Sequence, residues 1–263
     1  MIIVKIGGGQ TINLTGIIRD LAAVQESFII VHGANALRDE LAAKLNYQKK
    51  VITSVSGYVS VFSDQNTIDL MMMAYAGLRN KRIVELCHQH GINAIGLSGL
   101  DGKAIQGNRN KGIRVKKGEK IMLVRDFSGK PQTVNKELLL LLLGHGYVPV
   151  LSVPIIDENN CAINSENDDI INVLQRSLPV DKILQFIEAP GFLEDKNNPD
   201  SLVASILKQE LVDREMQVTG RMKRKLLALR RLFEEGAKTV IISDGRTEHP
   251  VADALAGKGT VIE

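Results

Sequence analysis

The sequence predicts an α/β fold, a three-layer αβα sandwich with a mostly parallel central sheet. Short β-branched runs alternate with longer stretches of helical period along the chain, and strands separated by helices are typical of a buried parallel sheet with helices on both faces. With 263 residues, 44% of them hydrophobic, the chain can bury a sizeable core without disulfides or metals. We expect one large domain or two closely joined lobes.

The alternation predicts the elements in chain order. Strands are expected at residues 1–6, 28–33, 92–99, 147–153, 182–188 and 237–243. Helices are expected at residues 16–24, 36–45, 136–146, 168–178 and 220–236. Residues 66–91 are expected to form one long helix or a bent helix pair that ends at Gly91.

Two segments interrupt this pattern. Residues 103–130 alternate basic and apolar side chains around Lys117 and Gly118, which favours an antiparallel ribbon over a crossover helix. Residues 190–202 are rich in Pro, Asn and Asp, which indicates a surface loop between two lobes.

Composition excludes several classes of protein. A net charge of +3, from 33 basic and 30 acidic residues, is too balanced for a protein that binds nucleic acid by neutralising many phosphates. Cys87 and Cys161 lie far apart without metal-ligand spacing, so we expect buried, reduced thiols in a reducing cytoplasm. The apolar run at 137–144 is far shorter than the ~20 residues that span a bilayer, and no leader opens the chain. We therefore expect a cytoplasmic protein without membrane or nucleic-acid partners.

Three glycine-bearing turns follow predicted strands, at residues 5–9, 31–34 and 97–102. Each alone is an ordinary strand-to-helix turn, but the carboxyl ends of parallel strands share one edge, where glycines let backbone N–H groups approach an anion. We expect all three turns to lie together there. Neither a Walker A loop nor a dinucleotide fingerprint is present. Lys5, at the end of the first strand, favours a multiply charged anion.

Two further clusters carry charge. Lys223, Arg224 and Lys225 crowd the start of a predicted helix, which is unfavourable unless an anion offsets them, although a solvated basic face explains them as well. Residues 164–169, NSENDD, precede or open another helix, where they can cap it, hold a metal through oxygen atoms, or fix lysine side chains.

The order of motifs then resembles the amino acid kinase family from end to end. These motifs are VKIGG, VHG, NKRIVEL, GLSGLDG, GYVPVL, N-x-x-x-D, APGFL, GRMKRK, DGR and GTVI. The pairing of GLSGLDG with GRMKRK resembles the branch that phosphorylates glutamate or 2-aminoadipate attached to a LysW-type amino-group carrier protein, a relative of acetylglutamate kinase. The resemblance implies the amino acid kinase fold, with an acceptor-binding lobe at residues 1–172 and a nucleotide-binding lobe at residues 173–263.

The resemblance also implies site residues, by position in this chain. The catalytic set is Lys5, Lys225 and Asp168, where two lysines flank the transferred phosphoryl group and the aspartate orients them. The acceptor set is Gly33, Ala34, Val61 and Asn164. The nucleotide set is Gly7, Gly8, Glu188, Gly191 and Lys225. The implied cofactors are ATP and Mg²⁺, with the metal held mainly by the ATP phosphates, and the implied assembly is a homodimer formed through residues 71–85.

Four positions depart from the family pattern. Ala34 stands where a second glycine is expected, so its methyl group is expected to intrude on the acceptor, and Val61 stands where relatives carry an arginine that grips the acceptor α-carboxylate. Where the family has N-x-D-G-D-Q, this chain has NSENDD at residues 164–169. Where the family has Asp/Asn-Val-Pro-Gly, this chain has EAPG at residues 188–191. Because Lys5, Lys225 and Asp168 are all present, this pattern favours a working kinase with an altered acceptor.

The basic ribbon is a candidate docking surface for a small acidic carrier protein, with solvated charge as the alternative. Its residues are Arg109, Lys111, Arg114, Lys116, Lys117, Lys120 and Arg125. The resulting hypothesis is ATP-dependent phosphorylation of a side-chain carboxylate on a carrier-bound, glutamate-like acceptor. The alternatives are acetylglutamate kinase, which uses a free N-acyl amino acid, and a non-catalytic regulatory or carrier-binding homologue.

Overall fold

A computed structural model describes residues 1–55, 57, 59–117, 120–195, 197–217 and 220–263. Its strands are β1 (Ile2–Ile6), β2 (Phe28–His32), β3 (Val51–Thr53), β4 (Val59–Val61), β5 (Ala94–Ser98), β6 (Ile105–Arg109), β7 (Ile113–Lys117), β8 (Lys120–Val124), β9 (Gly129–Val134), β10 (Val148–Ser152), β11 (Ile155–Ile156), β12 (Ala162–Ile163), β13 (Lys182–Ile187), β14 (Ser205–Ile206), β15 (Thr239–Asp244) and β16 (Thr260–Ile262).

The α-helices are α1 (Leu14–Leu21), α2 (Asn35–Lys44), α3 (Gln65–Met71), α4 (Asn80–Gln89), α5 (Lys136–Gly144), α6 (Asn167–Ser177), α7 (Leu211–Gln217), α8 (Gly220–Glu234) and α9 (Pro250–Leu255). A π-helix, η1 (Met72–Arg79), joins α3 to α4, and short 3₁₀ turns are η2 (Asp101–Lys103), η3 (Pro199–Ser201) and η4 (Lys208–Glu210).

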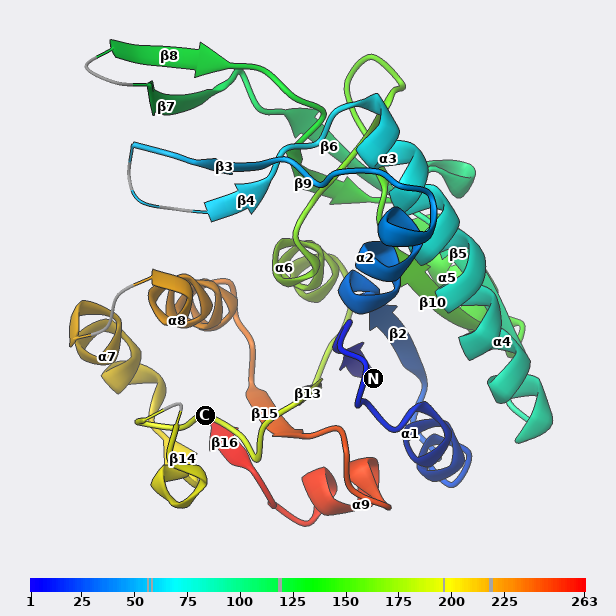
Figure 1. Ribbon diagram of the computed structural model, residues 1–263. Helices are drawn as coiled ribbons and strands as arrows, with labels where there is room; N and C mark the ends of the chain where they lie inside the picture. Colours follow the sequence, from blue (N-terminus) through cyan, green and yellow to red (C-terminus); the bar gives the residue numbers. More distant parts are fainter. Residues whose placement is uncertain (56, 58, 118–119, 196, 218–219) are drawn as a thin grey trace.

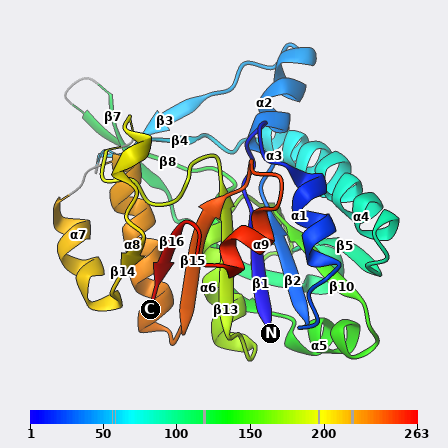
Figure 2. The ribbon, with the colours of Figure 1, turned by 90° about the horizontal axis from the view of Figure 1, so that it is seen from below.

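The central sheet has eight strands in the order β14-β16-β15-β13-β1-β2-β10-β5 (Figure 2). Neighbouring strands from β15 to β5 are parallel, and the direction reverses where β16 pairs antiparallel with β15. The carboxyl ends of β15, β13, β1, β2, β10 and β5 therefore lie along one edge of the sheet. This mostly parallel sheet confirms the predicted fold class.

Side-chain alternation along β1 divides the core into two layers. Ile3 packs in one cluster with residues of α6 and α8, whereas Ile2, Val4 and Ile6 pack in a second cluster with residues of α1, α4 and α9. Because side chains in a strand alternate between faces, Lys5 belongs to the α6 face. The position of Lys5 thus follows directly from the pleat of β1.

Residues 65–89 form the predicted long helix, but its middle is π-helical. The segment α3–η1–α4 is continuous, and Gly91 follows it with a φ of 78°, the left-handed conformation that often ends a helix. Met73 and Leu78 are exposed on this helix, whereas Met71 is buried.

The predicted antiparallel ribbon is confirmed. Strands β7 and β8 form a hairpin, and β6 pairs antiparallel with β9 at its base. A second hairpin, β3–β4, contacts it through a bridge between Ser54 and Val115. Both hairpins project from the body of the molecule in Figure 1.

The segment 190–202 joins two strands of the same sheet, which corrects the expectation of a loop between two lobes. It leaves β13, contains η3, and leads to β14, which pairs with β16. Since β13 also pairs with β1, β13 and β14 both belong to the eight-stranded central sheet. The division into lobes at residue 172 stays a prediction.

The two cysteines differ in environment. Cys87 is buried on α4, and burial raises the pKa of its thiol to about 12, so the thiol stays protonated. Cys161 is exposed, because it lies in the turn before β12, so the expectation of two buried thiols is wrong for this residue. None of the helices in the described ranges has the length and hydropathy needed to span a bilayer.

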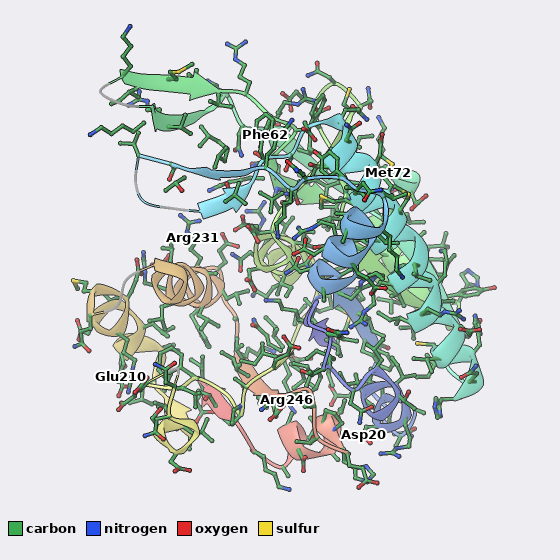
Figure 3. The ribbon with its side chains drawn as sticks, viewed as in Figure 1. Asp20, Phe62, Met72, Glu210, Arg231 and Arg246 are labelled. Atoms are coloured by element: carbon green, nitrogen blue, oxygen red, sulfur yellow. The ribbon has the colours of Figure 1, made fainter. Side chains whose placement is uncertain are left out.

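Helices α1 and α9, from opposite ends of the chain, are joined by a side-chain cap. A carboxylate oxygen of Asp20 accepts hydrogen bonds from the N–H groups of Val251 (3.0 Å) and Ala252 (3.2 Å) at the start of α9. Figure 3 labels Asp20 on α1 beside α9. The first and last quarters of the chain therefore pack as neighbours.

Candidate active site

Lys5 and Asp168 form an ion pair at the carboxyl end of β1. The ammonium of Lys5 donates to Oδ1 of Asp168, and the two side chains are 15% and 32% exposed, so the pair faces a partly solvated space. Asp168 lies in the first turn of α6, where the positive end of the helix dipole favours a carboxylate. The structure thus joins two residues of the predicted catalytic set across 163 positions of sequence.

Glycine turns after β1 and β2 interlock beside this pair. A Cβ atom on Gly8 would lie 2.6 Å from the backbone N of Asn35, and one on Gly33 would lie 2.9 Å from the N of Gly8. The carbonyl of Gly8 accepts a hydrogen bond from Ala36 N at 3.0 Å. These contacts leave no room for side chains, so the glycines permit close backbone packing at the start of α2.

The third glycine turn lies apart from the first two, which corrects the expectation that all three meet. Strand β10 separates β5 from β2, and Gly99 N donates to the carbonyls of Ser152 and Pro154 at 3.1 and 2.9 Å. Asp101 is also engaged, since its carboxylate accepts from the N–H and hydroxyl of Ser98. This turn therefore closes the end of β10 and does not join Lys5.

His32 is a structural residue beneath the turns. It is fully buried, and burial lowers its pKa to about 3, so the imidazole is neutral at physiological pH. Its Nε2 lies 3.2 Å from Nδ2 of Asn80, an amide that can only donate, so Nε2 is the acceptor and Nδ1 carries the proton. With both nitrogens committed to the interior, His32 is not available as a general base.

A cavity opens from the Lys5–Asp168 pair toward the C-terminal part of the chain. It is lined by Lys5, Asp168, Gln185, Ile187, Gly191, Phe192, Ala228, Leu229, Leu232 and Ile242. Gly191, from the predicted nucleotide set, is among them. Residue 225 precedes Leu229 by four positions in α8, and the side chain of Lys225 lies outside the described residues.

Glu188, also from the nucleotide set, reaches across to the turn after β1. Its Oε1 accepts hydrogen bonds from the backbone N and the hydroxyl of Thr11, at 2.9 and 2.7 Å. These hydrogen bonds from Thr11 hold the pKa of the Glu188 carboxyl below its usual value. Gly7 joins the same region, because its N–H donates to the carbonyl of Phe186 at 2.9 Å. We call the turns after β1, β2 and β13 the phosphoryl end of the site.

Two of the predicted acceptor residues, Val61 and Asn164, lie toward the hairpins, and we call this region the acceptor end. The other two, Gly33 and Ala34, lie instead in the turn after β2, at the phosphoryl end. Nδ2 of Asn164 donates to the hydroxyl of Ser63 at 3.1 Å, just after β4. Val61 lines a recess together with Arg38, Asp39, Ala42, Tyr47, Lys49, Thr67 and Leu70. Ala34 is buried in the core cluster with Ile3, so its methyl group packs into the interior.

Within the described part of the chain, three buried polar atoms near these turns lack a hydrogen-bond partner, and sequence reasoning gave none of them an individual role. These atoms are Ser165 Oγ, Asn167 Oδ1 and Arg79 Nε. Buried polar atoms are normally paired, so these are free to contact a ligand. The polar run at 164–169 was a sufficient signal for the first two, but nothing in the local pattern around Arg79 indicated its position beside Gly7, whose carbonyl lies 3.5 Å from Nη2.

The predicted docking residues divide into two groups. Lys111, Arg114, Lys116, Lys120 and Arg125 are exposed on or beside the β7–β8 hairpin. Arg109 is engaged instead, because its Nε donates to Asp157 at 3.0 Å and its guanidinium lies 4.4 Å from the ring centre of Phe127. The side chain of Lys117 lies outside the described residues. Arg109 therefore has a structural role.

The parallel αβα sheet presents glycine turns and a lysine–aspartate pair at one edge, an arrangement that suits a phosphorylated ligand. The chain belongs to the amino acid kinase family, whose model matches residues 1–244. Family membership identifies the reaction class as ATP-dependent phosphoryl transfer.

Individual relatives agree with this assignment. The LysW-aminoadipate kinase of Thermus thermophilus is 37% identical, with 100% of each chain covered, and the acetylglutamate kinase of Methanopyrus kandleri is 29% identical with the same coverage. Among solved structures, the carbamate kinase of Giardia superposes with a TM-score of 0.68 at 13% identity, covering 99% of this chain and 97% of its own. The structural likeness supports the fold.

Proposed function

We propose that this chain transfers the γ-phosphoryl group of ATP to the side-chain carboxylate of a glutamate- or 2-aminoadipate-like acceptor attached to an amino-group carrier protein. The observation that carries the proposal is the Lys5–Asp168 pair beside the interlocked turns of Gly8 and Gly33. The Thermus relative, whose name states LysW-aminoadipate as its substrate, supports the choice of acceptor.

The chemistry requires alignment and charge relief but no general base. A carboxylate acceptor is already ionised at neutral pH, so attack on phosphorus depends on in-line positioning and on cations that offset the negative charge. Lys5 supplies one cation, and Lys225 is proposed to supply the second from α8. Asp168 holds the Lys5 ammonium toward the cavity. The neutral, buried state of His32 agrees with a mechanism that needs no base.

Magnesium would arrive with the nucleotide. Within the described ranges, no group of three His, Cys, Asp or Glu side chains is placed to hold a metal ion. We propose that Mg²⁺ is bound mainly by phosphate oxygens of ATP, where it offsets their charge. The protein contributes the lysines and the backbone N–H groups of the glycine turns.

The β7–β8 hairpin is the proposed docking surface for an acidic carrier. Besides its exposed cations, the hairpin carries three consecutive exposed apolar residues, Ile121, Met122 and Leu123. Positive charge steers an acidic partner, and apolar side chains bury surface once it has arrived.

The proposed homodimer rests on a different surface. Met73 and Leu78 are exposed apolar residues on the α3–η1–α4 helix, and they are available to pack against a second copy.

Acyl phosphate formation tests the function directly. The purified chain, Mg·ATP and hydroxylamine are incubated with one of two acceptors: glutamate or 2-aminoadipate on a small acidic carrier, or free N-acetylglutamate. We expect hydroxamate with the carrier-bound acceptor. Hydroxamate only with the free acceptor would identify acetylglutamate kinase, as in the Methanopyrus relative. Loss of both hydroxamate formation and ATP hydrolysis would identify a non-catalytic homologue and refute the proposal.

A further inference from the structure

Glu188 links two loops that are far apart in sequence. It follows β13 directly, and its Oε1 accepts two hydrogen bonds from Thr11 in the turn after β1, 177 positions away. The backbone N–H of Gln10 adds a further favourable contact that stabilises the ionised carboxyl. The carboxylate is therefore held by successive donors of the turn that follows the glycines.

Gly9 and Glu188 are sterically dependent on each other. A Cβ atom on Gly9 would lie 2.0 Å from Cδ and from Oε2 of Glu188, far inside contact distance. The Glu188 carboxylate thus occupies the space that any other residue at position 9 would fill. Only glycine at this position allows the carboxylate to lie against the backbone of the turn.

Other charges nearby do not divert Glu188 from the turn. Arg246, at the end of β15, is the cation that faces it, and Figure 3 labels this residue at the same edge. Arg246 is held by Asp244, whose two oxygens accept hydrogen bonds from Nε and Nη2 at 2.8 and 2.7 Å. The glycine turn is consequently the direct hydrogen-bonding partner of Glu188.

We propose that Glu188 is a positioning residue for the nucleotide: it fixes the turn at Gly7–Gly9 so that the N–H groups of Gly8 and Gly9 face the phosphates. This inference rests on the proposed function. Three successive glycines have wide conformational freedom, and fixing them before the ligand arrives removes part of the ordering cost of binding. Because the contact is exposed, it contributes little to global stability, so its effect falls on nucleotide affinity.

The experiment measures the dissociation constant of Mg·ADP for the full chain by titration calorimetry, which requires no acceptor. We expect Glu188→Ala to weaken binding by roughly 5- to 20-fold, at the low end for lost hydrogen bonds to a charged group because the contact is exposed. Thr11→Val removes only the hydroxyl donor and should weaken binding by less. The double variant should be no weaker than Glu188→Ala alone, because the hydroxyl contact that Thr11→Val removes is part of the contact that Glu188→Ala removes. Glu188→Gln keeps an acceptor oxygen and should recover part of the affinity, whereas Glu188→Asp is one methylene too short and should not.

Two controls separate positioning from damage to the fold. Glu248→Ala removes another exposed glutamate near the same edge and should leave Mg·ADP affinity unchanged. The melting temperature of each Glu188 and Thr11 variant should equal that of the unmodified chain. Gly9→Ala should also weaken Mg·ADP binding, because its methyl group would displace the Glu188 carboxylate from the turn.

Several results would overturn the inference. These are an unchanged dissociation constant for Glu188→Ala, additive effects of Glu188→Ala and Thr11→Val, or tighter Mg·ADP binding, which would make the carboxylate a competitor of the phosphates. A chain that binds Mg·ADP with the expected variant pattern but forms no acyl phosphate would refute the proposed function alone. A chain that forms acyl phosphate but shows no variant effect would refute this inference alone, and a chain that binds no Mg·ADP would refute both.

Discussion

The phosphoryl end and the acceptor end of the site are built in different ways. At the phosphoryl end, the turns follow buried strands of an eight-stranded sheet, and their backbones contact each other directly through Gly8 and Gly33. At the acceptor end, two short hairpins stand away from the sheet and meet at one bridge between Ser54 and Val115. Under the proposed function, the chemistry would depend on the core, whereas recognition would depend on elements that can change without disturbing it.

The strongest test of this comparison is to remove the cation at the phosphoryl end. Lys5→Met should lower kcat by about two to three orders of magnitude, the usual cost of losing one preorganised electrostatic contact in a transition state. Lys225→Met should have an effect of the same size. The hydroxamate assay measures both, with Lys44→Met, an exposed lysine of α2, as the control. Near-normal turnover of either variant would show that these lysines do not carry the reaction.

The second test uses the pH dependence of stability to probe His32, which is buried beneath the phosphoryl end. The pKa of His32 is about 3 in the folded chain and about 6.5 in the unfolded chain. Between these two pH values the unfolded chain binds one more proton than the folded chain, so the free energy of unfolding decreases as pH falls through this window. Between pH 6.5 and 5 we expect a loss of about 2 kcal/mol in the free energy of unfolding. Urea denaturation of the wild type and His32→Gln measures it, and equal slopes for both chains would contradict the assignment.

The third test moves to the acceptor end. Reversing three exposed charges on the hairpin, with Arg114→Glu, Lys116→Glu and Lys120→Glu together, should raise KM for the carrier-bound acceptor about tenfold at low salt. The difference should shrink toward 0.15 M salt because exposed charges are screened. KM for ATP is the internal control, since the phosphoryl end is untouched. If KM for the carrier-bound acceptor in the unmodified chain does not depend on salt, the hairpin is not an electrostatic docking surface for the carrier.

The smallest expected effect comes from Val61→Arg. Restoring the cation that relatives carry should lower KM for carrier-bound glutamate by only about three- to tenfold, because the position is partly exposed and water screens the new contact. Arg38 and Lys49 already line the same recess, which reduces the benefit further. Steady-state kinetics with glutamate and 2-aminoadipate carriers measures it. If the unmodified chain already uses carrier-bound glutamate as well as the arginine-bearing relatives do, the altered-acceptor hypothesis is wrong.

The sequence pattern was sufficient where local periodicity decides the outcome. The alternation within residues 103–130 predicted an antiparallel ribbon, and the glycines after the first two strands predicted turns that meet at one edge of the sheet. Asp168 was correctly placed near Lys5 because the family resemblance carried that pairing, which spacing alone does not contain.

Features that depend on tertiary neighbours were not predictable. The third glycine turn was misplaced because strand order, not strand number, decides which turns meet, and β10 inserts between β2 and β5. The exposure of Cys161 follows from its place in a turn before a two-residue strand. The contact between Glu188 and Thr11 joins distant residues, and no periodicity connects them.

The place of β1 in the sheet also governs how the molecule is assembled. This strand precedes the other strands of the sheet in the chain, yet one of its two neighbours, β13, begins only at Lys182. Until that part has left the ribosome, β1 has one unpaired edge, which is a template for pairing with other chains. A newly made N-terminal half of this protein therefore carries an open sheet edge, which moves outward to β13 when that strand pairs with β1 and is covered there only when β15 follows.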